Sequence, residues 1–159
     1  MDSGNIGFVL LCAAFVFVMT PGLAMFYGGL VRKKNVVNTM MTSIFIIGVG
    51  IVMWVLFGYS LSFAPSGNAF IGDFRWLGLE GVSLTEGYTD DASIPNMVFS
   101  AFQMMFAVIT PALITGAVAG RMKFKSIFVF TIFWSLIVYY PLAHICLLYH
   151  ISEPTRQEA

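Results

Sequence analysis

The sequence predicts an all-α, polytopic membrane protein with four transmembrane helices. Of its 159 residues, 58% are hydrophobic and only 10% are charged, whereas charged residues make up about a quarter of a typical soluble domain. The charged residues also gather in a few short segments, which separate four long uncharged stretches. The formal net charge is zero, so the composition points to a lipid bilayer as the partner and not to a nucleic acid.

The four uncharged stretches are residues 3–31, 36–72, 92–120 and 126–152, with the histidines counted as neutral. A helix of roughly 20 apolar residues crosses the bilayer core, and each stretch reaches that length. Backbone polar groups in lipid must find partners within the protein, which favours helices, and the alternation typical of a membrane barrel is absent. We therefore expect helices at about 6–31, 36–63, 94–120 and 126–149.

The first stretch is predicted to be a retained helix and not a cleaved signal peptide. It lacks the basic segment that opens a signal peptide, since Asp2 is its only early charge. Its apolar part is also longer than the apolar region of a typical signal peptide.

The distribution of charge predicts the orientation of the helices. Six of the eight Lys and Arg residues lie in the short segments 32–34 and 121–125, and every Asp and Glu lies elsewhere. Four alternating helices place these two segments on the same side, and basic loops of membrane proteins usually face the cytoplasm. We expect a multi-pass protein of the cell (plasma) membrane with loops 32–35 and 121–125 in the cytoplasm. The N-terminus, the connection 64–93 and the C-terminal tail are then outside.

The outer connection opens with a turn signal at residues 65–68. Its apolar side chains are expected to fold against the outer face of the helices. They are Phe70, Phe74, Trp76 and Leu77.

Small residues and prolines inside the predicted helices indicate close packing and bends. Prolines remove a backbone hydrogen bond and produce either a fixed kink or a hinge; they are Pro21, Pro111 and Pro141. Glycines allow close approach of neighbouring helices; the candidates are Gly28, Gly29, Gly48, Gly116 and Gly120.

The third predicted helix carries the most suggestive side chains. Phe99, Phe102 and Phe106 follow one helical face. From the spacing alone this pattern favours a lipid-facing or packing stripe; the alternative is an aromatic mouth that attracts a small cation. Gln103 is a polar side chain expected to face neighbouring helices and form hydrogen bonds there.

Other polar residues in the helices give no catalytic arrangement. His144 lies in the fourth helix and is either a functional group or a structural, hydrogen-bonding histidine. Cys12 and Cys146 fit small buried apolar residues better than a disulfide or metal pair. The sequence offers no nucleophile–base set, metal-ligand cluster or phosphate loop. We therefore expect no enzymatic activity, no metal and no cofactor.

Three segments together resemble a known family. The segments are Thr20–Asn35, Phe102–Ala107 followed by Gly116–Arg121, and Trp134 followed by Tyr139–His144. In order and spacing they are similar to the first, third and fourth helices of the ammonium transporter family (Amt/Mep/Rh), on the Amt branch. The chain is thereby identified as an N-terminal fragment of such a protein.

The resemblance implies a fold and a function that the composition alone does not. Members are homotrimers that carry ammonium or ammonia through an eleven-helix, inverted-repeat channel fold, and a cytoplasmic nitrogen-sensing regulator is a possible partner. By motif match, Phe106 takes the position of a gate phenylalanine. Phe102 and Gln103 take positions that line or support the outer, substrate-binding vestibule.

The sequence also departs from the family pattern. Leu147 stands where the family has a vestibule tryptophan, and the glycines that follow it are missing. The pore histidines, the second gate phenylalanine and the vestibule serine are absent, and neither His144 nor His150 matches a pore histidine. We expect residues 1–144 to be the N-terminal part of the transporter domain and residues 145–159 to be a non-native or out-of-frame tail.

The missing parts imply that this chain alone does not transport. The alternative is a small four-helix membrane subunit with a structural or regulatory role. The fragment interpretation predicts that the four helices leave an unfilled face for further helices, whereas a self-contained subunit would have no such face.

Overall fold

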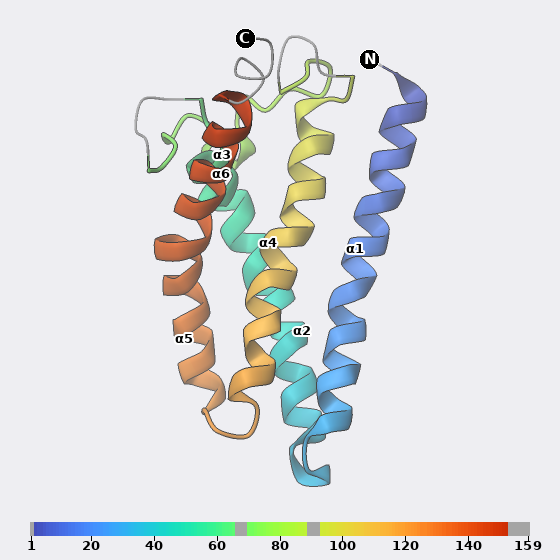
Figure 1. Ribbon diagram of the computed structural model, residues 1–159, viewed down its shortest axis with the longest axis vertical. Helices are drawn as coiled ribbons and strands as arrows, with labels where there is room; N and C mark the ends of the chain where they lie inside the picture. Colours follow the sequence, from blue (N-terminus) through green and yellow to red (C-terminus); the bar gives the residue numbers. More distant parts are fainter. Residues whose placement is uncertain (1, 66–69, 89–92, 153–159) are drawn as a thin grey trace.

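The computed structural model describes residues 2–65, 70–88 and 93–152, with side chains up to residue 147. Regular structure in these residues is helical apart from an isolated bridge between Gly87 and Pro95. Four long helical segments run up and down side by side, and the two basic loops lie together at one end (Figure 1). The all-α prediction is confirmed.

The first hairpin is built from α1 and a composite second helix. Helix α1 spans Ser3–Leu30, and the side chain of Asp2 accepts the Gly4 N–H at 3.0 Å to cap it. A short 3₁₀ turn, Lys33–Asn35, leads into α2, Val36–Met53. A π-helical turn, Trp54–Gly58, then joins α2 to α3, Tyr59–Phe63.

The second hairpin repeats this pattern. Helix α4 spans Asn96–Val118 and is followed by Gly120 at φ 72°, a left-handed conformation that glycine adopts readily. Helix α5, Phe124–Trp134, passes through a π-helical turn, Ser135–Tyr139, into α6, Tyr140–Ser152.

Four segments in the described part of the chain are long and apolar enough to cross a membrane. They are Ser3–Leu30, Lys33–Phe63, Asn96–Val118 and Phe124–Leu147, with mean hydropathies of 2.3, 2.4, 1.9 and 1.8. The prediction of four membrane-spanning helices is confirmed.

Helix α4 packs against both α1 and α2, which also contact each other. Glycines create the close approaches: a Cβ on Gly116 would lie 2.4 Å from Cζ of Tyr27, and a Cβ on Gly28 would lie 2.9 Å from Cγ of Met40. The prediction of close packing is confirmed at these two glycines.

The same prediction is wrong for Gly29 and Gly48, where a Cβ would meet no atom within 4 Å. Both lie on outward faces of their helices. The close approach of α2 to α4 is made by Gly50 instead, whose Cβ would lie 3.1 Å from Cγ2 of Val108. The sequence gives the position of each glycine, but the rotation of its helix determines whether that glycine faces a neighbouring helix.

The connection between α3 and α4 folds back onto the helices, as predicted for Trp76. The Trp76 ring stacks on Tyr59 with centroids 5.4 Å apart. The prediction is wrong for Phe70 and Phe74, which are 74% and 67% exposed. Between them, the Gly72 N–H donates to the Leu61 carbonyl at 2.8 Å, so the backbone of this segment makes the contact and its phenylalanine rings do not.

Candidate functional site

The three predicted site residues lie within five consecutive positions of α4. The rings of Phe102 and Phe106 meet edge to face, with centroids 5.1 Å apart and planes at 82°. Phe106 is 38% exposed, and Phe102 and Gln103 are half-buried. An aromatic pair beside an amide, open on one side, offers ring faces that attract a cation and a side chain that can hydrogen-bond to it.

The backbone of α4 is irregular just beyond Phe106. The Thr110 hydroxyl donates to the Phe106 carbonyl at 2.6 Å. Pro111 has no N–H, so the Ala107 carbonyl lacks its regular helical donor. The exposed ring therefore lies at a point where the hydrogen-bond pattern of the helix changes.

Phe99 does not share the surroundings of this pair. Its ring packs edge to face on Phe63 at 5.2 Å and stacks on Tyr88 at 5.3 Å. The connection 70–88 lies against the first turn of α4 and leaves Phe99 half-buried in contact with it. The predicted three-residue stripe is divided into an internal packing residue and an open pair.

A larger aromatic cluster, which the sequence reading missed, lies beside that first turn. Its members come from α3, α4, α6, the connection and the first π-helical turn, and they are Trp54, Tyr59, Phe63, Trp76, Tyr88, Phe99 and Tyr140. We refer to this set as the aromatic cluster.

Hydrogen bonds hold three of the polar side-chain atoms of the aromatic cluster. The Trp54 Nε1–H donates to Ser100 Oγ at 3.4 Å, and the Tyr59 hydroxyl donates to Asn96 Oδ1. The Tyr88 hydroxyl donates to the Phe63 carbonyl at 2.9 Å. Burial raises the pKa of Tyr88 above its usual value, which keeps this hydroxyl protonated as a donor.

The π-helical turns explain why the cluster was missed. Trp54 and Tyr59 are five residues apart, yet their ring centroids lie 5.8 Å apart. Trp134 and Tyr139 repeat this spacing across the second π-helical turn at 6.2 Å. Neighbours on an α-helix are three or four residues apart, so an α-helical projection separates both pairs. The Trp-to-Tyr spacing of five, which recurs in the second and fourth membrane-spanning segments, is the signal that could have shown them.

His144 takes the structural alternative that the sequence left open. Its side chain is only 2% exposed, and Nδ1 lies 3.1 Å from the Ser62 carbonyl oxygen. The histidine thereby joins α6 to α3. The hydroxyl of the same Ser62 is buried and has no hydrogen-bond partner among the described residues.

The chain is similar in sequence to known ammonium transporters. The family described as the Ammonium Transporter Family matches residues 7–150. The chain is 49% identical over 144 residues to an ammonium transporter of Bacillus subtilis (strain 168), covering 91% of this chain and 35% of the relative. It is 43% identical over 157 residues to an ammonium transporter of Mycobacterium bovis, covering 90% of this chain and 33% of the relative.

Solved structures show the same fold. Mep2 of Saccharomyces cerevisiae matches with a TM-score of 0.78 and 34% identity, over 90% of this chain and 34% of that one. Mep2 of Candida albicans matches with a TM-score of 0.78 and 29% identity, over 91% and 31%. The chain thus spans about a third of the length of the proteins it matches.

The expectation of a non-native tail falls mainly on residues beyond those with described side chains. Only 145–147 of the range 145–159 have them, and 153–159 lie outside the described residues altogether. The expectation stays a prediction.

Proposed function

The chain belongs to the ammonium transporter family, and we propose that it forms the first four membrane-spanning helices of a channel that carries ammonium or ammonia across the cell membrane. The observation that carries the proposal is the family match over residues 7–150 together with the open Phe102–Phe106 pair on α4. The competing idea of a self-contained four-helix subunit has no comparable support.

We propose that Phe106 acts as a gate at the entrance to the transport path. Its ring is held edge to face by Phe102 and remains partly exposed on one side of α4. Phe102 and Gln103 line or support the vestibule that receives the cation before the gate. The ring faces would favour a desolvating cation, while the apolar gate would hinder passage of hydrated ions.

The remaining parts of the proposal concern the complete protein. It is a homotrimer with an eleven-helix fold, its N-terminus outside and its loops 32–35 and 121–125 in the cytoplasm, where a nitrogen-sensing regulator binds. Residues 1–144 supply part of the first-repeat side of the path, and transport needs the pore histidines and the second repeat, which we expect in a full-length protein of about three times this length.

The test is the substitution Phe106→Ala in a full-length transporter that carries this segment. Removing the ring opens the gate position and deletes the edge-to-face contact with Phe102. We expect a changed uptake rate for methylammonium, or a changed preference between ammonium and potassium, measured in cells that lack other ammonium transporters.

The matched control is Phe133→Ala on α5, because Phe133 is 58% exposed and forms no part of the predicted site. Both variants must reach the membrane in amounts equal to the parent. If Phe106→Ala transports like Phe133→Ala and the parent, Phe106 is a packing residue and the gate assignment is wrong.

A further inference from the structure

An open apolar groove of about 550 Å³ runs between α2 and α5, on the outer surface of the four-helix bundle. Apolar side chains and one glycine line it, and neither Phe102 nor Phe106 belongs to it. Gly48 lies in its floor, and a Cβ there would meet no atom within 4 Å. Phe45 and Phe128 lie toward one end, and Met53 and Ile132 toward the other.

The length of the groove fits one leaflet of a bilayer. From Ile44 to Met53 it follows α2 for nine residues, which at the helical rise is about 14 Å. Half of the hydrocarbon core of a bilayer is roughly 15 Å deep. The groove therefore matches the upper part of a single acyl chain directed from one surface toward the midplane.

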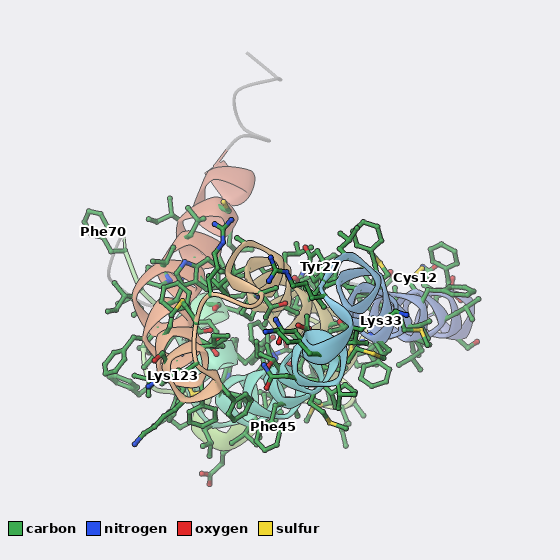
Figure 2. All side chains as sticks on the ribbon, turned by 90° about the horizontal axis from the view of Figure 1, so that it is seen from below. Cys12, Tyr27, Lys33, Phe45, Phe70 and Lys123 are labelled. Carbon is green, nitrogen blue, oxygen red and sulfur yellow. The ribbon has the colours of Figure 1, made fainter. Side chains whose placement is uncertain are left out.

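The end of the groove near Phe45 lies beside a basic loop. The ring of Phe45 meets that of Phe124, the first residue of α5, at a centroid distance of 5.2 Å. Lys125 precedes Phe128 by three residues, so both side chains lie on one face of α5. Figure 2, seen from the end with the basic loops, shows Lys123 and Phe45 on the same edge of the bundle, away from Cys12 on α1.

No acidic residue offsets these lysines in the helices around the groove. The sequence has no Asp or Glu between Asp2 and Asp73, or between Asp91 and Glu153. Lys123 and Lys125 are both exposed. Their charge at the mouth of an apolar groove is complementary to a molecule with an anionic head and an apolar tail.

We propose that this groove binds an anionic phospholipid of the leaflet that the basic loops face. One acyl chain lies over Gly48 between α2 and α5, and the phosphate contacts Lys123 and Lys125. Basic pockets between helices at a membrane surface recognise lipid head groups in this manner. The site is separate from the proposed transport path.

The test uses photoreactive lipids in bilayers of phosphatidylcholine that contain the purified protein. Trace phosphatidylglycerol or phosphatidylcholine, each with a diazirine on the same acyl carbon, is photolysed and the labelled peptides are mapped by mass spectrometry. We expect phosphatidylglycerol to label residues 44–53 and 128–132 several-fold more than phosphatidylcholine does. Surfaces of α1 should show no such preference.

Two sets of variants test the binding of the acyl chain and the binding of the head group separately. Gly48→Leu fills the hollow and should reduce labelling of the groove several-fold for both lipids, whereas Gly22→Leu on α1, which also has free space around its Cβ, should leave it unchanged. Lys123→Gln with Lys125→Gln should lower phosphatidylglycerol labelling to the phosphatidylcholine level. Lys33→Gln with Lys34→Gln should not.

Equal labelling of the groove by the two lipids in the parent protein would overturn the proposal, because the lysines would then not distinguish phosphatidylglycerol from phosphatidylcholine. So would an unlabelled groove, which would mean that another protein segment fills it, or labelling that Gly48→Leu leaves intact. Because the lysine variants leave the packed core unchanged, the test of head-group binding can still be carried out if Gly48→Leu fails to fold.

Discussion

Gly116 shows how a single residue sets the distance between two helices. The Tyr27 ring of α1 lies directly over it, and the Tyr27 hydroxyl donates to the Leu113 carbonyl of α4 at 3.1 Å. The ring is thus held at both its face and its tip. A glycine is required at 116 because the space that a methyl group would take is already filled.

At the residue scale we predict that Gly116→Ala lowers stability. The new Cβ would lie 2.4 Å from Cζ of Tyr27, so the ring or α1 must move. Overpacking costs about 1–3 kcal/mol, which exceeds the gain of about 0.5–1 kcal/mol that alanine brings to a helix. The midpoint of thermal unfolding in detergent, followed by circular dichroism, should fall.

Gly29→Ala is the matched control, since its Cβ would meet no atom within 4 Å and only the helical gain remains. Its unfolding midpoint should stay or rise. Shifts of the same sign and size in the two variants would contradict the packing role of Gly116.

At the scale of elements, each hairpin has a long helix that changes to a π-helical turn before its last segment. The residue that follows the second turn contacts the first: a Cβ on Gly58 would lie 2.8 Å from Cζ of Tyr140, so the Tyr140 ring covers the end of the first turn. The wider turn re-aims Trp54 and Tyr59 to one side. The aromatic cluster depends on this re-aiming.

Ser60 fastens the connection to α3, and we predict that Ser60→Ala loosens it. The Ser60 hydroxyl donates to the Asp73 carbonyl at 2.7 Å and accepts the Trp76 N–H at 3.0 Å. Removing it leaves two backbone groups without this partner, at about 1–3 kcal/mol for each one that stays buried and unpaired. The Trp76 amide should exchange its hydrogen several-fold faster, as measured by mass spectrometry.

Ser126→Ala serves as the control, because Ser126 is exposed in the first turn of α5, and α5 begins at the end of the bundle opposite to the connection (Figure 1). It should leave exchange at Trp76 unchanged. If Ser60→Ala also leaves it unchanged, the stacking of Trp76 on Tyr59 holds the connection without Ser60.

At the scale of the whole molecule, the number and nature of the crossings follow from the sequence because lipid imposes them. Long uncharged stretches have no alternative to helices in a bilayer, and the pair Phe102 and Phe106 is local to one helix. Gly50 facing Val108, and Trp54 meeting Tyr59 across a π-helical turn, depend on helix rotation. Rotation is determined by packing between segments far apart in the chain, which hydropathy does not record.

Orientation in the membrane is the whole-molecule property that remains a prediction. Arg32, Lys33 and Lys34 and the basic residues of 121–125 lie at one end of the bundle, and the connection 70–88 with Glu80 lies at the other. In a background with Cys12 and Cys146 replaced by alanine, Glu80→Cys should react with a membrane-impermeant maleimide applied to intact cells. Lys33→Cys and Lys125→Cys should react only after permeabilisation, because basic loops are retained in the cytoplasm. The two lysine variants control for each other, since they lie in separate loops on the same predicted side. Labelling of either in intact cells, with Glu80→Cys protected, would reverse the orientation, and the lipid site beside Lys125 would then belong to the outer leaflet.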